Sequence, residues 1–526
     1  MRRLSDMFRD FRRDERGVFA VLFSLIAVVL IAFAGSAVDF TLLQQRRTTA
    51  QVALDAAALA LQSKINTMAP DAIGQRALTL VRDRMNDPQV TVEITGVEID
   101  KSAGSLRLTA SFDAPSYFVT LVGVHRLGAA VRSQATRKSQ RIEIAMVLDN
   151  SGSMETANRM VYLRQAATNA TRIFFADSTP GDPRIFVGLV PFTQYVNIDP
   201  RNANAAWIDR AGRSPISGDN FQLDPNSPLA RYDRIALFET MAVERWRGCV
   251  EARVFPYDTD DTPPEYWRPE TLFTPLFAPD EPDHRNWLGQ YLFNNHYLTD
   301  QRGRCEAPPR WQTWSDRTLQ ERMCKYQGAT LTRPASMQQA RGPNADCPTN
   351  PITPLTSTQK TVVDGIAAMY PQGGTNIAQG AVWGLHMLTP GLPLQEGANY
   401  DQSVTKVMIV MTDGDNFHSA DNNMNGATFY TAYGYPYNRR LGKPGDSTAT
   451  LQRLMDERLL ATCKSAKDLG IKIYTIGLSM TSRSTEEMLE KCSSGEGYAF
   501  LPEKPTELNA IFEKIADQLS VLRISQ

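Results

Sequence analysis

The first part of the chain changes its pattern of apolar and polar positions twice. Residues 18–38 form a run of 21 positions without a charge, long enough for a helix that crosses a lipid bilayer. Residues 39–63 lack proline and glycine and are rich in alanine, which predicts that the same helix continues. A small α+β domain is expected next, with helices at 71–85 and 115–124 and with alternating, strand-like segments at 90–99, 105–113 and 127–135.

From residue 139 onward, short apolar runs alternate with amphipathic segments. The runs Ile142–Leu148 and Lys406–Thr412 are rich in Val, Ile, Leu and Met, a pattern typical of strands buried on both faces of a parallel sheet. Strands that alternate with helices predict an α/β fold with a doubly wound parallel sheet. The other strands are expected at 184–196, as a pair with a turn at Pro191, and at 471–478; the helices are expected at 157–175, 358–369, 376–388, 451–469 and 506–522.

Residues 199–352 interrupt this alternation and are too many for a plain loop. Many prolines and few apolar runs indicate an irregular fold held by disulfides and aromatic packing. Two interpretations of this insertion are open: it only packs against the α/β domain, or it shapes access to a site and recognises a partner. It holds six of the seven tryptophans (Trp207, Trp246, Trp267, Trp287, Trp311 and Trp314) and four of the six cysteines (Cys249, Cys305, Cys324 and Cys347).

The cysteines of the insertion are widely spaced and form no CxxC pair, which argues against a zinc site. Outside the membrane they meet an oxidising compartment, where disulfides are expected. Cys463 and Cys492 lie in helical segments on either side of the strand at 471–478. Helices that flank one strand can pack on the same face of a sheet, so we predict a disulfide between these two residues. Two buried free thiols are the alternative.

Composition excludes one class of partner. The chain is 42% hydrophobic and 21% charged, which is ordinary for a folded protein, and its net charge is −1. No global field therefore draws it to nucleic acid, and no phosphate-cradling glycine loop or aromatic-basic RNA motif is present. The five histidines are scattered singly, and none stands with a nucleophile in a recognisable hydrolase motif.

The arginines around the apolar run indicate its orientation. Many precede the run and few follow it, so the positive-inside rule predicts a short cytoplasmic tail and a single-pass anchor in the bacterial inner membrane, with the bulk of the chain in the periplasm. A cleaved signal peptide is the alternative, because Gly35 and Ala37 are small residues suited to precede a cleavage site. The arginines are Arg2, Arg3, Arg9, Arg12, Arg13 and Arg16 before the run, and Arg46 and Arg47 after it.

Five side chains with hard oxygen atoms stand beside the two apolar strands. Asp149, Ser151 and Ser153 alternate directly after the first strand, Thr375 follows two glycines, and Asp413 follows the second strand. In an extended chain, alternate side chains point the same way, and the carboxyl ends of parallel strands share one edge of a sheet. The five residues can therefore form one site. Their oxygens suit Mg²⁺ foremost, with Mn²⁺ or Ca²⁺ possible, rather than zinc or copper.

This set resembles the metal-ion-dependent adhesion site (MIDAS) of von Willebrand factor A domains, in which Asp-x-Ser-x-Ser is combined with a distant Thr and an Asp-Gly. The resemblance implies that the serines and the threonine contact the ion and that the aspartates often act through water. It also implies an open position on the ion, which a carboxylate of a protein partner fills. A non-enzymatic adhesion or assembly module is the function expected from this resemblance.

A metal-dependent hydrolase is the alternative function. In that interpretation Asp149 is the nucleophile, or Asp413 activates water. A hydrolase needs a general acid or base near the ion. Asp415 and His418 are the candidates that the sequence offers for this role.

The amino-terminal segment carries a second resemblance. The order RRDERG, apolar run, AVDF and QRRTTAQVALDAAALALQ is similar to the anchor module of TadE/TadG-like pilus-assembly proteins. Pilins of that family have a glutamate five residues after the cleavage glycine, whereas Leu22 stands at that distance from Gly17. The resemblance is therefore to TadG, the larger non-pilin member, which joins such an anchor to a von Willebrand A domain. It implies a role in assembling or anchoring a Tad/Flp pilus, with pilus components or pilin as partners.

These arguments predict four parts of the chain. Residues 1–17 form a basic cytoplasmic tail, and residues 18–38 the transmembrane helix. Residues 39–138 form the juxtamembrane helix and the small α+β domain. Residues 139–526 form the A domain, interrupted by the insertion at 199–352.

Overall fold

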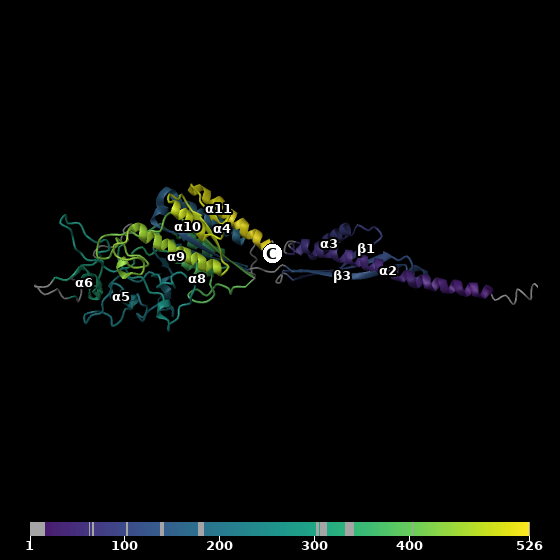
Figure 1. The fold of residues 1–526 in the computed structure, drawn as a ribbon, viewed down its shortest axis with the longest axis horizontal. Coiled ribbons are helices and arrows are strands. Elements are labelled where there is room, and N and C mark those ends of the chain that lie inside the picture. The colour runs from purple at the N-terminus through teal and green to yellow at the C-terminus, as the bar shows by residue number, and fades with distance from the viewer. Residues whose placement is uncertain are drawn as a thin grey trace, which may run out of the picture. The chain divides into compact units, whose positions relative to one another are not determined.

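The protein is described here by a computed structural model, which divides into two compact units, Met1–Ser139 and Gln140–Gln526 (Figure 1). Each unit is described by itself. The residues that the structure describes are 16–62, 64–65, 68–100, 104–136, 141–176, 184–300, 305, 313–331, 341–401 and 403–524.

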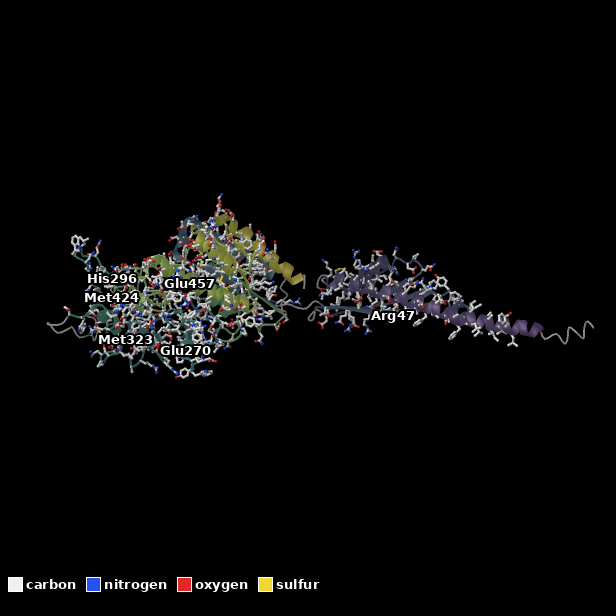
Figure 2. All side chains as sticks on the ribbon, in the orientation of Figure 1. Arg47, Glu270, His296, Met323, Met424 and Glu457 are labelled. Carbon is white, nitrogen blue, oxygen red and sulfur yellow. A yellow bond between two sulfur atoms is a disulfide. The ribbon has the colours of Figure 1, made fainter. Side chains whose placement is uncertain are left out.

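The described part of the first unit contains one continuous helix, α2 (Arg16–Gln62), as the sequence predicts. The helix is long and apolar enough to cross a membrane. Its side chains at 21–34 are largely exposed (Figure 2). From Ala50 onward, alanines and Leu54 are buried in the core of the unit. The alanine-rich stretch thus supplies the small side chains that let the helix lie close to the sheet.

A three-stranded antiparallel sheet completes this unit, in the order β1 (Thr91–Asp100), β2 (Ser105–Pro115) and β3 (Arg126–Thr136), with α3 (Pro70–Met85) packed beside it. Apolar side chains of β2 alternate and face the helices. The expected helix at 115–124 is wrong in extent: only a 3-10 turn, η1 (Val119–Val122), forms. Pro115 instead pairs with Arg126 in the sheet, which extends the β2–β3 ladder to the end of the strand.

The second unit is built on a mixed sheet in the order β11-β10-β9-β4-β5-β6-β7. Five of these strands are mutually parallel: β4 (Arg141–Asp149), β5 (Ile185–Phe192), β9 (Val404–Thr412), β10 (Lys472–Gly477) and β11 (Ala499–Phe500). Three short strands pair antiparallel on the β5 side: β6 (Val196–Asn197), β7 (Cys249–Val250) and β8 (Thr353–Thr356).

Pro191 lies inside β5, opposite Leu148 of β4, so the turn expected there is wrong. The neighbouring β8 pairs only with Val187 and Leu189 of β5. Proline lacks a backbone donor and is tolerated where no ladder hydrogen bond depends on it. The chain bends only after β5 has ended, between Phe192 and β6.

Helices cover both faces of this sheet (Figure 1). Ile144 and Met146 of β4 share a buried cluster with three helices, α4 (Arg159–Phe175), α7 (Gln359–Ala367) and α11 (Leu508–Ile524). Ala145 and Val147 share the opposite cluster with α8 (Ile377–Leu388), α9 (Thr448–Asp468) and α10 (Arg483–Cys492). Because the side chains on both faces of the sheet are buried, the central strands have continuous apolar runs in the sequence.

The insertion has little regular structure, mainly the short helices α5 (Arg234–Thr240) and α6 (Asp316–Glu321). It packs on the α8 side, where Trp207 and Phe273 contact Trp383 with ring centroids 6.4 and 4.9 Å away. Trp246 is buried as well. The expected aromatic packing is wrong for two tryptophans, since Trp267 is 73% and Trp287 is 90% exposed. Trp314 lies under the guanidinium of Arg322, and Trp311 falls outside the described residues.

A segment between β9 and α9, residues 414–447, packs against the insertion, which the sequence did not lead us to expect. Glu251 of the insertion accepts hydrogen bonds from Arg440 (2.5 Å) and from the Tyr430 hydroxyl (2.6 Å), and it also pairs with Arg234. Tyr435 donates to Glu281 at 2.9 Å. Buried charges must be paired in this way to offset their loss of water. The two segments therefore form one substructure.

All six cysteines form disulfides: Cys249–Cys347, Cys305–Cys324 and Cys463–Cys492. The last pair joins α9 to α10, with the two Cα atoms 5.2 Å apart, as expected from the helices that flank β10. The other two pairs lie within the insertion, where the spacing of the cysteines left the connectivity open.

Candidate metal centre

Asp149 ends β4 with a fully buried carboxylate that is held from two sides. One carboxylate oxygen accepts the backbone N–H of Ser151 at 2.8 Å. The other accepts the hydroxyl of Thr412, the last residue of the adjacent strand β9, at 2.7 Å. Neighbouring parallel strands thus fix the position of this carboxylate at their shared carboxyl edge.

Asp413 follows β9 and is the second carboxylate at this edge. It accepts the hydroxyl of Ser153 at 2.5 Å and a guanidinium N–H of Arg159, near the start of α4, at 2.7 Å. The hydroxyls of Ser151 and Ser153 are 3.0 Å apart. Four of the five residues predicted for the site therefore form one continuous chain of hydrogen bonds.

Thr375 lies on a separate loop that is tied to the Asp149 loop through the backbone. Gly152 N–H donates to Gly373 C=O and Gln372 N–H donates to Asn150 C=O, both at 2.9 Å. Gly373 has φ +66°, and a Cβ there would come within 3.0 Å of the Asp346 carboxyl group. A larger residue would therefore push the Thr375 loop away from Asp346 of the insertion. Thr375 and Ser153 line the same cavity, which the backbone bonds between the two loops help to shape.

Burial and the nearby carboxylate of Asp413 raise the pKa of Asp149 to about 7. The guanidinium of Arg159 supplies one positive charge at Asp413. A divalent cation among these oxygens would offset the repulsion between the two carboxylates, so the donor set fits such an ion. No cluster of three or more His, Cys, Asp or Glu occurs among the residues that the structure describes, and this candidate relies on hydroxyls instead.

Two of the hydroxyl residues, Ser153 and Thr375, line a cavity of about 910 Å³, whereas Ser151 is buried. Besides Ser153 and Thr375, its lining includes Asn294, Arg341 and Asp346, all from the insertion. A second hollow of about 1100 Å³ shares part of this lining (Arg341, Asp346, Gln372 and Gly373) and adds three further arginines (Arg201, Arg245 and Arg247) and two carboxylates (Asp199 and Glu244). The insertion therefore borders the approach to the candidate metal centre.

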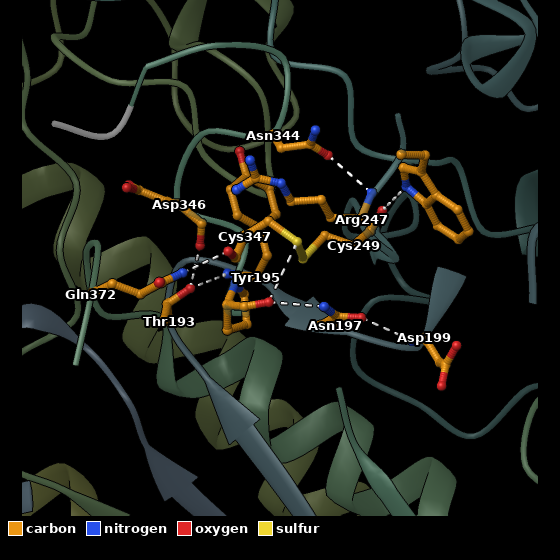
Figure 3. Close-up of a disulfide and its surroundings, with 12 residues drawn as sticks. Thr193, Tyr195, Asn197, Asp199, Arg247, Cys249, Asn344, Asp346, Cys347 and Gln372 are labelled. Atoms are coloured by element: carbon orange, nitrogen blue, oxygen red, sulfur yellow. Dashed lines mark hydrogen bonds between the residues drawn. A yellow bond between two sulfur atoms is a disulfide. The ribbon is translucent and has the colours of Figure 1, made fainter. Parts of the chain in front are cut away.

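The Cys249–Cys347 disulfide lies beside the Thr375 loop (Figure 3). The side-chain amide of Gln372 donates to the carbonyl of Cys347 at 2.6 Å. The Thr193 hydroxyl donates to the carbonyl of Asp346 at 2.5 Å. These bonds connect the cross-linked part of the insertion to the loops that carry the site.

The two residues considered for hydrolysis lie in different surroundings. Asp415 lines the cavity and accepts a hydrogen bond from the Thr485 hydroxyl. His418 is 1% exposed, and burial lowers its pKa to about 4. Within the described part of the chain, no histidine lines the cavity. The geometry thus places no imidazole base beside Asp149.

Two residues of the site were missed from sequence. Thr412 holds Asp149, and Arg159 holds Asp413. A signal existed for Thr412, because it is a polar residue at the end of an otherwise apolar run and directly precedes Asp413. No short motif marks Arg159, whose position depends on where α4 begins.

Comparison with protein families identifies the amino-terminal segment. Residues 17–63 match the family described as "Putative Flp pilus-assembly TadE/G-like". This match confirms the TadE/G-like resemblance of the anchor module. A search of curated proteins found no match.

Several solved structures are distantly similar. The pilus adhesin SpaC from Lactobacillus rhamnosus GG matches at 13% identity over 82% of this chain and 35% of its own, with a TM-score of 0.32. This chain thus spans about a third of SpaC. The vWF domain of the type V pili tip protein Mfa5 from Porphyromonas gingivalis matches at 10% identity over 74% of this chain and 97% of its own, with a TM-score of 0.33.

Proximal thread matrix protein 1 from the mussel byssus, in a structure with a zinc-occupied MIDAS motif, matches at 10% identity over 72% of this chain and 48% of its own. The TM-score is 0.29. Likenesses at this level carry no argument about the function of this chain.

Proposed function

We propose that this TadG-like protein is a membrane-anchored, extracytoplasmic module that binds another protein through a divalent cation, in the assembly or anchoring of a Tad/Flp-type pilus. The TadE/G-like match of residues 17–63 supports the pilus context. The arrangement of the α/β unit supports a von Willebrand factor A domain with a doubly wound sheet, interrupted at 199–352. The proposed function is binding rather than catalysis.

The observation that carries the proposal is the hydrogen-bonded chain from Asp149 through Ser151 and Ser153 to Asp413. In the proposed site, the hydroxyls of Ser151, Ser153 and Thr375 contact the ion, and the two aspartates neutralise part of its charge. Mg²⁺ is the favoured ion, because the donors are all hard oxygens; Mn²⁺ and Ca²⁺ suit the same set. A carboxylate of the partner completes the coordination.

The arginines of the hollow beside the site support an acidic partner. Four arginines and three carboxylates line this hollow, and one of the arginines, Arg201, is paired with Asp199. No ion pair joins the other three, Arg245, Arg247 and Arg341, to an acidic residue within the described ranges. A positive surface beside a metal site attracts acidic segments and speeds their association. The partner we expect is therefore a pilus component or pilin with an exposed acidic side chain.

The proposed topology follows from the arginine distribution. Residues 1–17 lie in the cytoplasm, residues 18–38 cross the inner membrane, and residues 39–138 hold the A domain in the periplasm. The helix α2 has the length and composition that this role requires.

Crosslinking in the native host, followed by identification of the crosslinked proteins, tests the proposal. Wild-type protein should crosslink to pilus components, and Asp149→Ala should lose these products because the ion is no longer held. Asp468→Ala, at the exposed carboxylate that pairs with Lys464 on α9, is the matched control and should keep them. Identical products from wild type and Asp149→Ala would contradict the proposal.

A further inference from the structure

A loop of the first unit is fastened to the outer end of the proposed membrane helix. This apolar loop, residues 116–125, joins β2 to β3 and contains η1. The carboxylate of Asp39 on α2 accepts three successive backbone N–H groups, from Tyr117 (3.0 Å), Phe118 (2.7 Å) and Val119 (2.8 Å). One turn earlier, a Cβ on Gly35 would collide with the ring of Phe118. Both residues of α2 are thus specialised to hold the loop.

These contacts set the depth of the loop along the helix. The uncharged run ends at Val38, and Gly35 lies three residues before it. At a rise of about 1.5 Å per residue, Phe118 contacts the helix roughly 4.5 Å inside the end of the run. The apolar loop is therefore level with the boundary between the hydrocarbon core and the headgroups.

The surface of the loop is apolar and open. Leu121 is 57% and Val122 is 66% exposed, and Tyr117 and Val124 are also exposed. Residues 116–124 carry no charge. Exposed apolar side chains of this kind continue the exposed apolar surface of α2, which includes Val38 and Phe40. Tyrosine is a residue that prefers the membrane–water interface.

The backbone of the loop is also suited to a poorly hydrated environment. Leu121 N–H donates to Phe118 C=O and Gly123 N–H to Thr120 C=O, both at 3.0 Å. Val124 N–H donates to Val119 C=O at 3.2 Å. Together with the three amides held by Asp39, these internal bonds satisfy six of the backbone N–H groups of residues 117–124, which lowers their need for water.

We infer that the apolar loop inserts into the outer interface of the bilayer and forms a second membrane contact beside the helix. The occupant of this surface is lipid, since the loop is continuous with the lipid-facing surface of the anchor. The inference rests on the proposed membrane anchoring. Two contacts fix the rotation of the small domain about the helix axis, which a single spanning helix leaves free.

Depth-dependent fluorescence quenching tests the inference on the full-length protein in nanodiscs. All six native cysteines are in disulfides, so single added cysteines can be labelled with the environment-sensitive dye NBD. The three sites are Phe33→Cys in the proposed span, Leu121→Cys in the apolar loop and Glu98→Cys on β1. Glu98 is the control site far from the loop. It lies opposite Arg107 of β2, which is eight residues, or about 26 Å at the rise of a strand, from Pro115 at the start of the loop.

Lipids with a doxyl group near the headgroup should quench the label at residue 121 and shift its emission to shorter wavelength, while the label at residue 98 is unaffected. The label at residue 33 should be quenched by doxyl groups deeper in the chain. Quenching at residue 33 without quenching at residue 121 would overturn the loop inference but leave the membrane anchor standing. The same result is expected if a protein partner, rather than lipid, covers the loop in the cell. No quenching at 33 would refute the anchor itself. Equal quenching at 121 and 98 would refute a specific contact by the loop.

Discussion

Removing the Cys249–Cys347 disulfide should both destabilise the second unit and weaken metal binding at the proposed site. The double variant Cys249→Ala/Cys347→Ala opens a loop with a sequence separation of 98, which corresponds to about 4.7 kcal/mol in the chain-entropy model. Cys463→Ala/Cys492→Ala opens a separation of 29, or about 3.6 kcal/mol. The two losses of stability are similar, so the second variant is a control for destabilisation alone.

The effect on metal binding should differ between the two variants. The carbonyl of Cys347 accepts the Gln372 side chain, and the backbone of Gln372 is bonded to Asn150 beside Asp149. Loss of that one ordering hydrogen bond, at about 1 kcal/mol, corresponds to roughly five-fold weaker ion binding. Cys463 and Cys492 join α9 to α10 and have no such connection to the Thr375 loop among the described contacts.

Denaturant unfolding monitored by circular dichroism measures the stability of both variants, and calorimetry with Mg²⁺ measures their affinity under conditions in which each is folded. We expect both to lose several kcal/mol of unfolding free energy. Only the variant without Cys249–Cys347 should show the weaker affinity. The proposed link between this disulfide and the site would be refuted if the two variants had the same affinity for Mg²⁺, whether unchanged or equally weakened relative to wild type.

Three further predictions concern other contacts. Arg159→Gln should strengthen Mg²⁺ binding roughly two- to five-fold by calorimetry, because the guanidinium competes with the ion for Asp413; an unchanged or weaker affinity would contradict this. Asp39→Ala should accelerate hydrogen exchange of the amides at 117–124 about ten-fold or more, whereas Asp55→Ala, on the same helix, should not; equal protection in both variants would count against the role of Asp39. Reporter fusions after Ser63 and at Gln526 should both report an extracytoplasmic location, with the protein resistant to carbonate washing; a soluble form beginning near Val38 would instead show signal-peptide cleavage.

The sequence was most informative where local pattern and long-range structure coincide. The central strands are buried on both faces, so continuous apolar runs marked β4 and β9 and located Asp149 and Asp413 at one edge. Arg159 could not be found in this way, because no short motif marks it and its contact with Asp413 depends on where α4 begins. Glu251 and Arg440 show the same limit: neither belongs to a recognisable motif, and only the fold brings them together. The turn expected at Pro191 does not form, because β8 pairs with β5 only at Val187 and Leu189 and no bond to β8 depends on the missing N–H of Pro191.

The insertion was predictable in kind but not in detail. Its prolines and cysteines indicated an irregular, cross-linked fold, and both internal disulfides form. Its core, however, uses phenylalanines such as Phe221, Phe238 and Phe277 at least as much as tryptophan. Side chains in an irregular fold follow no period of 2 or 3.6, so composition alone does not show which aromatic rings are buried.

Binding of Mn²⁺ to the full-length protein, followed by electron paramagnetic resonance of the free ion, tests the central claim most directly. Wild-type protein should bind one Mn²⁺ that Mg²⁺ displaces, with Ca²⁺ and Zn²⁺ as further competitors to rank the ions. Asp149→Ala/Asp413→Ala should retain its circular dichroism spectrum and lose this binding, since the two aspartates are the only carboxylates of the predicted set. One Mn²⁺ bound with undiminished affinity by the folded double variant would contradict the proposed site.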